Sequence, residues 1–225
     1  MCGRFSLNKT KDEVEKYLYD YFGIEESLAN FIPRYNIAPT QLVYAVIHDG
    51  QNYRIGLIKW GLKNDSSSNA QNNFMVINAR SETLLQKPMF QKLLLQKRCL
   101  ILADGFYEWD KQDKTPYYIS LHNKTLFTIA GLWNTSLVID GSKLSTCTII
   151  TTKANSLVTP IHDRMPVIFD EKNQNKWLSY QEIDNQKLLS LLQPYSEKQM
   201  EKYSVSTLVN NPKNDTKDIL NAITK

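Results

Sequence analysis

Residues 98–153 contain the pattern that decides the fold. They include four short runs rich in β-branched and aromatic residues: RCLILAD (98–104), PYYISL (116–121), LFTIAGLW (126–133) and KLSTCTIITT (143–152). Polar and turn-forming residues separate the runs. This alternation of short apolar runs and turns is typical of consecutive strands in one antiparallel sheet system.

Two helical patterns come before this region. The first covers TKDEVEKYLYDYFG (10–23), where Thr10 and Glu13 form a capping box and a glycine ends the apolar stripe. The second, SETLLQKPMFQKLLLQK (81–97), is interrupted by Pro88. Because proline cannot continue a helix from the preceding turn, we expect two short helices or a helix and a loop here.

Between these helices the sequence predicts an irregular segment and a hairpin. Prolines punctuate IPRYNIAPTQ (32–41), which we expect to be irregular. The next run, LVYAVIHDGQNYRIGLIKW (42–60), predicts a hairpin that turns at Asp49-Gly50, a dipeptide suited to a type I′ turn. The polar run NDSSSNAQNN (64–73) predicts a flexible loop.

The C-terminal third predicts a strand at MPVIF (165–169), helix around residues 175–192 and a final β-like run, VSTLV (205–209). The chain contains no internal repeat and no linker long enough to separate domains. The predicted fold is α+β, a mainly antiparallel curved sheet or small β-barrel flanked by helices, in one domain over residues 1–225.

The composition is that of an ordinary globular protein. Of 225 residues, 42% are hydrophobic and 22% charged, and the formal net charge of +4 is compatible with a polyanionic partner without demanding one. No apolar run approaches the roughly 18 residues of a membrane span, and the polar N-terminus does not resemble a signal peptide. We therefore expect a cytoplasmic protein.

The cysteines differ in their setting. Cys99 and Cys147 lie in apolar runs and are expected to be buried in strands, whereas Cys2 directly follows the initiator methionine. The three have no spacing typical of a metal site or a set of disulfides. If Met1 is removed, Cys2 carries a free α-amine and a thiol on one carbon skeleton; the alternative is that its position has no chemical meaning.

Polar residues also interrupt three apolar segments, FMVINARSET, ADGFYEW and IHDRMPVIF. Glu108 lies between aromatic residues, where desolvation raises the pKa of a carboxyl toward the range useful for proton transfer. Strand alternation alone favours the other orientation, with Glu108 toward solvent. Asp163 or Arg164 is placed to orient the ring of His162. The sequence pattern is compatible with either a structural or a functional role for His162 and for Asn78.

Seven short motifs follow one another in a fixed order across nearly the whole chain: MCGRF, RYNIAP, WG, INARSET, ADGFYEW, TIITTKAN and IHDRMPVI. In these motifs the sequence resembles the SRAP family, the SOS response-associated peptidases or abasic-site processing proteins. The resemblance implies a sensor that crosslinks to abasic sites in single-stranded DNA and is nucleoid-associated when bound to DNA. We expect a monomer, and the sequence shows no site for a metal, cofactor or nucleotide. It also implies that Cys2 is the crosslinking nucleophile, that Asn78 and His162 position and polarise the sugar aldehyde, and that Glu108 transfers protons. Family DNA contacts match Arg4, Asn36, Pro39, Trp60, Arg80, Thr152 and Arg164.

The chemistry of a terminal cysteine fits this resemblance, because its amine can form an imine with an aldehyde and its thiol can then close a thiazolidine. Without closure, the imine permits lyase-like strand scission. The peptidase label fits removal of Met1 by Cys2 itself, although an aminopeptidase is an equal alternative. The chain departs from the family where many members carry a proline and a second tryptophan after WG, since LKNDSSSNAQNNFMV stands there. This puts base stacking and a preference for DNA junctions in question.

Two other functions fit parts of the pattern. Class II glutamine amidotransferases also begin with MCG and use the terminal cysteine on an amide. They continue with a glycine-containing apolar run and an NGEIYN-like loop, neither of which occurs here. A noncatalytic single-stranded DNA-binding module instead predicts salt-sensitive binding that survives Cys2→Ala.

Overall fold

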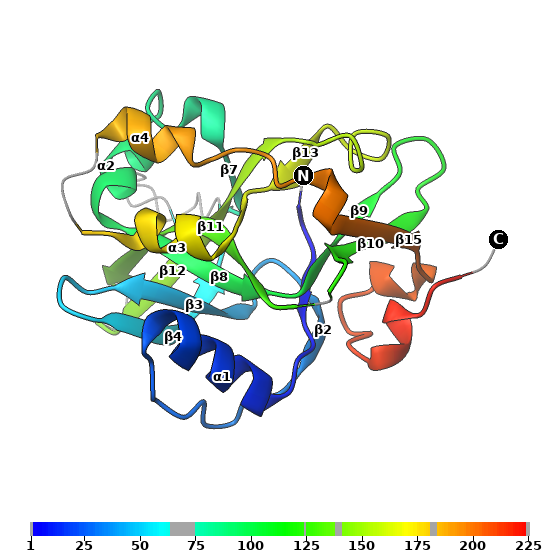
Figure 1. Ribbon diagram of the computed structural model, residues 1–225, viewed down its shortest axis with the longest axis horizontal. Helices are drawn as coiled ribbons and strands as arrows, with labels where there is room; N and C mark the ends of the chain where they lie inside the picture. Colours follow the sequence, from blue (N-terminus) through cyan, green and yellow to red (C-terminus); the bar gives the residue numbers. More distant parts are fainter. Residues whose placement is uncertain (1, 64–74, 124, 138–140, 181–183, 224–225) are drawn as a thin grey trace.

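The computed structural model describes residues 2–63, 75–123, 125–137, 141–180 and 184–223. Two mainly antiparallel sheets form the body of the protein (Figure 1). The larger runs in the order β13-β12-β4-β3-β8-β11-β14, with β7 paired to β12, and the smaller in the order β15-β10-β9-β1-β2. Only the pairings of β12 with β4 and with β7 are parallel among the described strands. The α+β class and the mainly antiparallel sheets predicted from the sequence are confirmed.

The strands and helices have the following bounds. The larger sheet contains β3 (Leu42–His48), β4 (Tyr53–Trp60), β7 (Asn78–Arg80), β8 (Arg98–Ala103), β11 (Phe127–Leu137), β12 (Lys143–Lys153), β13 (Arg164–Pro166) and β14 (Ile168–Phe169). The smaller contains β1 (Phe5–Leu7), β2 (Arg34–Ile37), β9 (Gly105–Trp109), β10 (Pro116–Leu121) and β15 (Met200–Ser204), and β5 (Leu62–Lys63) pairs with β6 (Met75–Val76). The helices are α1 (Lys11–Phe22), α2 (Pro88–Gln96), α3 (Glu171–Leu178) and α4 (Asn185–Ser190), with 3-10 turns at Ser81–Thr83, Glu197–Gln199, Thr207–Asn210 and Lys217–Leu220.

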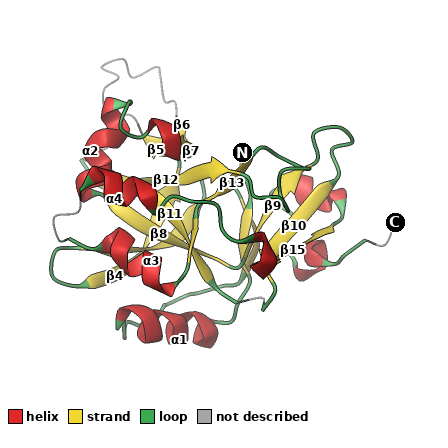
Figure 2. Cartoon of the chain, turned by 45° about the horizontal axis from the view of Figure 1, so that its top comes forward, coloured by secondary structure: helices red, strands yellow, loops and turns green. Residues whose placement is uncertain are grey.

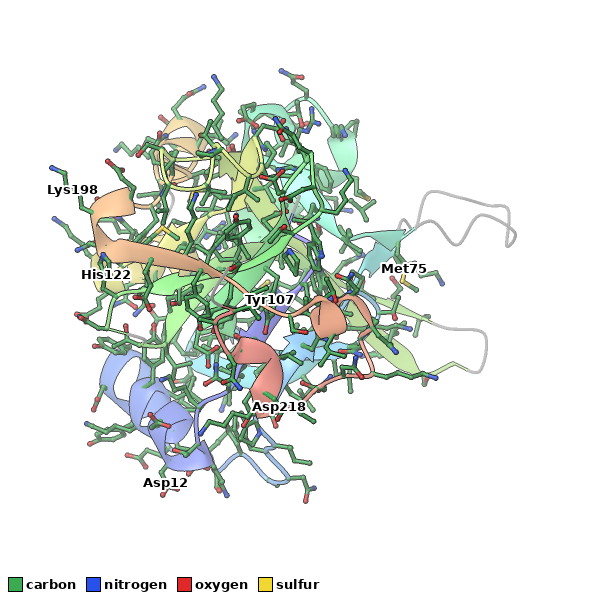
Figure 3. The ribbon with its side chains drawn as sticks, turned by 90° about the vertical axis from the view of Figure 1, so that its right-hand side faces the viewer. Asp12, Met75, Tyr107, His122, Lys198 and Asp218 are labelled. Carbon is green, nitrogen blue, oxygen red and sulfur yellow. The ribbon has the colours of Figure 1, made fainter. Side chains whose placement is uncertain are left out.

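Apolar side chains gather in one large core and one small cluster. The core takes residues from both sheets and from α1, α2 and α3, which lie on the outside of the sheets (Figure 2). The small cluster joins Tyr107 of β9 and Tyr118 of β10 to Val205, Val209 and Ile219 of the C-terminal segment. Figure 3 faces this side, with Tyr107 behind the turn that carries Asp218. The smaller sheet is therefore covered on both faces.

Several local predictions are confirmed. Thr10 and Glu13 make the reciprocal capping box of α1, and Gly23 ends that helix at φ 62°. Pro88 divides the second helical region and occupies the first turn of α2, where its missing N–H costs nothing. The four β-rich runs from residue 98 onward form β8, β10, β11 and β12.

The hairpin of β3 and β4 is confirmed, but its turn is not the expected type I′. The last strand pair is His48 with Tyr53, which leaves a four-residue loop in which only Gly50 has a positive φ, 104°. Asp49 holds this loop instead, because its Oδ1 accepts the N–H groups of Gln51 at 2.9 Å and Asn52 at 2.7 Å.

Two other predictions are wrong. The segment 32–41 is not irregular throughout, since Arg34–Ile37 forms β2, which pairs with β1. Prolines 33 and 39 flank this strand and remove no hydrogen bond from it. The run 205–209 is not a strand, because Ser206 caps a 3-10 turn at Thr207–Asn210. Helix also fills less of residues 175–192 than expected, as it is divided into α3 and α4.

None of the described helices is long and apolar enough to cross a membrane.

Candidate functional site

Cys2 precedes β1 by three residues, in the segment that runs beside the end of β9. Tyr107 N donates to Arg4 O at 2.9 Å, which continues the pairing of the two strands beyond Phe5 and Phe106. Asn78, at the start of β7, donates from Nδ2 to Cys2 O at 2.9 Å. The N-terminal end of the chain is thereby held beside β9 and β13 (Figures 1 and 2). The side chain of Cys2 is completely buried.

A buried polar network holds the other end of β1. Ser6 Oγ donates to Asp104 Oδ1 at 2.6 Å and shares a hydrogen bond of 2.9 Å with the Tyr118 hydroxyl. Asn8 Nδ2 donates to the same carboxylate at 2.9 Å. The Tyr118 ring crosses β9 at Gly105, where an added Cβ would lie 2.1 Å from it. This network fixes β1 against β9 and so fixes the position of Cys2.

Glu108 does not point to solvent, as strand alternation alone would favour. It is only 3% exposed. Phe106 packs in the large core and Tyr107 in the small cluster, so alternation places Glu108 on the side of the large core. Both faces of β9 are covered, a fact that alternation cannot reveal. Burial raises the pKa of Glu108 to about 7, which leaves the carboxyl about half ionised near neutral pH.

The thiol of Cys2 is in its neutral form. Burial raises its pKa well above the ordinary value, and the neighbouring Glu108 carboxylate raises it further. A reaction of this thiol therefore needs a group that takes up its proton. Glu108 is the carboxyl close enough for its charge to act on Cys2, and its pKa suits both accepting and returning a proton.

His162 lies half-buried in the segment before β13. Its Nδ1 accepts the backbone N–H of Arg164 at 3.0 Å, so the neutral ring carries its proton on Nε2. Asp163 Oδ1 also lies 3.1 Å from Nδ1. Burial lowers the pKa of His162 overall, while the Asp163 carboxylate opposes that effect. The ring is thus a neutral hydrogen-bond donor near pH 7.

Three of the residues predicted from the sequence hold buried polar atoms with no hydrogen-bond partner among the described residues. These atoms are Arg4 Nε, Asn78 Oδ1 and Arg164 Nε. Buried polar groups in native proteins nearly always have partners, so each such atom calls for an explanation. Two donors and an acceptor without partners suit a ligand rich in oxygen.

Two of the predicted DNA contacts are completely buried in the structure. Trp60 is completely buried, with its ring centroid 5.2 Å from that of Phe5 and its Nε1 donating to Ile77 O at 2.9 Å. Asn36 is also completely buried, and its Nδ2 contacts the carbonyls of Val209, Asn211 and Asn214 at 3.2, 3.1 and 2.7 Å. Neither side chain lines a surface groove, and both support the site from beneath.

The three predicted arginines differ in their partners. Arg164 is 7% exposed and makes a bidentate pair with Glu82, at 2.7 and 2.9 Å. Arg4 Nη1 donates to Asn36 Oδ1 at 2.7 Å and to Val209 O at 2.6 Å. Arg80 is exposed and forms no ion pair within the described part of the chain. Among these three arginines of the described chain, Arg80 alone offers its whole guanidinium to a ligand, whereas Arg4 and Arg164 offer only their Nε atoms unless an internal partner is exchanged.

Two predicted DNA contacts remain, Pro39 and Thr152. Pro39 is half-buried next to β2, and Thr152 is buried in β12, where it lines a cavity of about 400 Å3 with Glu82 and Lys153. The expected flexible loop at 64–73, and with it most of the stretch that replaces the family's second tryptophan, lies outside the described residues. The described residues contain no cluster of three or more His, Cys, Asp or Glu side chains arranged to hold a metal.

Lys111 is absent from the residues predicted from the sequence. Its Nζ donates to Asp163 Oδ1 at 3.1 Å, so it joins the loop after β9 to the segment that carries His162. A lysine three residues after Glu108 in the same strand-to-loop transition is the signal that would have identified it.

The family model of the SOS response associated peptidase (SRAP) matches residues 1–212. The chain is 45% identical to the abasic site processing protein YoqW of Bacillus subtilis over 98% of this chain and 99% of that protein. It is 29% identical to the abasic site processing protein HMCES of Xenopus tropicalis over 99% of this chain and 78% of that protein. A crystal structure of a protein from Bacteroides thetaiotaomicron matches with a TM-score of 0.86 at 24% identity, covering 99% of this chain and 100% of that chain; it shares the fold. The protein described here belongs to the SRAP family.

Proposed function

We propose that this protein processes abasic sites in single-stranded DNA by forming a covalent crosslink through Cys2 after Met1 is removed. The observation that carries the proposal is the burial of Cys2, whose backbone carbonyl accepts a hydrogen bond from the Asn78 amide and whose thiol lies within electrostatic reach of a Glu108 carboxyl with its pKa raised to about 7. Membership of the SRAP family and the similarity to abasic site processing proteins support the choice of substrate.

The reaction joins both functional groups of Cys2 to one carbon. An abasic deoxyribose opens to an aldehyde at C1′, and the α-amine of Cys2 condenses with it to an imine, releasing the aldehyde oxygen as water. The thiol then adds to the imine carbon, and its proton passes to the nitrogen. The product is a five-membered thiazolidine that contains the nitrogen, Cα, Cβ and sulfur of Cys2 and the C1′ carbon of the sugar.

Each neighbouring side chain has a role in these steps. Glu108 takes a proton from the ammonium or the thiol and returns it to the departing oxygen or the ring nitrogen. His162 donates a hydrogen bond from Nε2 to the sugar oxygen as C1′ changes its bonding, because its Nδ1 is occupied by Arg164 N. Asn78 holds the backbone carbonyl of Cys2 and thus keeps the nucleophile in line.

Closure of the ring removes the imine, which otherwise promotes β-elimination and cleavage of the strand. The crosslink therefore shields the lesion. In Cys2→Ser, whose amine can condense but whose hydroxyl closes the ring poorly, we expect lyase-like strand scission. Met1 must leave first, either by attack of Cys2 on its own preceding peptide bond or through an aminopeptidase. We propose that the protein acts as a monomer.

A denaturing gel tests the proposal. Purified protein is incubated with single-stranded DNA that carries one abasic site, beside Cys2→Ala, with intact-mass measurement to establish whether Met1 is present. We expect a heat-stable adduct from processed protein and none from Cys2→Ala. A Cys99→Ser variant is the matched control for loss of a buried thiol and should retain the adduct. Absence of the adduct from fully processed wild-type protein would refute crosslinking and return noncovalent DNA binding or amide hydrolysis as explanations.

A further inference from the structure

An exposed ion pair lies at the surface above Glu108 and His162. Lys111 and Asp163 come from separate loops, and their side chains are 57% and 66% exposed. Their charges act on the two buried residues nearby. Burial is the main cause of the raised pKa of Glu108; the Asp163 carboxylate raises this pKa further, and the Lys111 ammonium lowers it. Burial likewise lowers the pKa of His162, an effect that Lys111 strengthens and Asp163 opposes. The pair thus lies within electrostatic reach of the proposed reaction centre.

The backbone of the loop that carries Lys111 is fixed, whereas the Lys111 ammonium is held by an exposed ion pair. Asp110 Oδ1 accepts the N–H of Gln112 at 2.8 Å, and Lys114 Nζ donates to Lys111 O at 2.8 Å. Lysine ends in a compact ammonium on a flexible stem that can exchange one oxygen partner for another. Exposed ion pairs contribute little to stability, so an incoming anion readily replaces Asp163.

We propose that Lys111 binds a backbone phosphate of the DNA strand beside the lesion, and that Asp163 holds the lysine in place until the phosphate displaces it. This inference rests on the proposed function for the identity of the anion. Arg4 and Arg164 already donate to partners within the protein, whereas the partner of Lys111 is a solvent-exposed carboxylate. A phosphodiester is a stable anion with several acceptor oxygens and offers the ammonium an equivalent contact.

The test measures noncovalent binding and chemistry separately. Fluorescence anisotropy with a single-stranded oligonucleotide carrying a tetrahydrofuran abasic analogue reports binding alone, because the analogue has no aldehyde. Binding is compared from about 50 to about 200 mM salt for the wild type, Lys111→Gln, Asp163→Asn, the double variant and Lys16→Gln. Lys16 is the matched control: it also forms an exposed ion pair, with Asp20 at 2.8 Å, but on α1. A parallel gel with a natural abasic site reports crosslinking.

We expect Lys111→Gln to weaken binding and to reduce the slope of log affinity against log salt by about 0.7, the value of one single-strand phosphate contact. Over this four-fold change in salt, the variant then loses about 2.6-fold less affinity than the wild type. Asp163→Asn should strengthen binding in the wild-type background. The same substitution should strengthen binding less in the Lys111→Gln background. Lys16→Gln should keep the wild-type slope.

An unchanged slope in Lys111→Gln, or an effect of Asp163→Asn that is the same with and without Lys111, would overturn the inference. Adduct formation combined with an unchanged slope would refute this inference alone and leave the proposed function standing. A reduced slope without an adduct would refute crosslinking and leave the phosphate contact standing.

Discussion

Replacement of Glu108 by glutamine should make the folded protein more stable at alkaline pH while it removes the proposed proton acceptor. Glutamine has nearly the same shape and carries no charge, so it is free of the cost of burying a carboxylate. Glu108 is 3% exposed, and burial raises its pKa from 4.5 to about 7. The folded protein therefore holds this proton more tightly than the unfolded chain does.

The sign and size of the effect follow from that difference. Between pH 4.5 and about 7, the folded state binds more protons at Glu108 than the unfolded state, so the free energy of unfolding falls as the pH rises. A tenfold change in proton affinity corresponds to about 1.4 kcal/mol, which gives a loss of about 3 kcal/mol by pH 8. Glu108→Gln avoids this loss, and for a chain of this length the gain corresponds to roughly 6–12 °C in Tm.

The assay is urea unfolding of the wild type and Glu108→Gln near pH 4 and near pH 8. The difference in the free energy of unfolding between the two proteins is then compared at the two pH values. Other titrating groups cancel in this comparison. The exposed Glu197 supplies the control, since Glu197→Gln removes a carboxyl without relieving burial. The variant should also form adduct about 10²–10⁴-fold more slowly. If its advantage over the wild type is the same at both pH values, Glu108 is not desolvated and the reasoning about its proton transfer is refuted.

Three further substitutions test the structural reading by urea unfolding. Arg164→Ala should destabilise the fold by about 1.5–3 kcal/mol, because it breaks the pair with Glu82, whose side chain is 41% exposed, and the buried hydrogen bond to Thr151 O at 2.6 Å; destabilisation below about 1 kcal/mol would contradict this. Asn36→Ala should cost about 2–3 kcal/mol and make the C-terminal segment sensitive to limited proteolysis, since three carbonyls of that segment lose their hydrogen bond to the Asn36 amide; unchanged protease resistance would contradict this. Gly105→Ala should leave little soluble folded protein, because its Cβ would lie 2.1 Å from the Tyr118 ring, and wild-type stability would show that the ring moves aside at no cost.

Elements with strong local signals could be predicted from the sequence. The capping box of α1 and the β-branched runs of β8, β11 and β12 specify their structure within the segment itself. Strand β2 could not be predicted in this way. The carboxylate of Asp215 accepts the N–H groups of Tyr35 at 2.5 Å and Asn36 at 2.8 Å from about 180 residues further along the chain. That contact has no trace in the sequence around β2.

The site shows the same division. Local context identified Cys2, Glu108 and His162 as chemically able groups, but only the tertiary structure reveals which surfaces are covered. Alternation along β9 gives two faces without saying that both are buried, and this is why the orientation of Glu108 was open. Likewise, Trp60 resembles a groove residue in its motif, yet the core closes around it.

The hydrogen bond from Arg4 to Val209 O joins residues separated by 205 positions and has a consequence for the timing of assembly. Ribosomes extend a chain at about 5–20 residues per second, so roughly 10–40 s pass between the emergence of the first residues and the synthesis of their last partners. During that interval the nascent N-terminus has no strand β9 and no C-terminal segment to dock against. An enzyme that trims the terminus thus acts on an unfolded end, before the pocket that conceals Cys2 is complete.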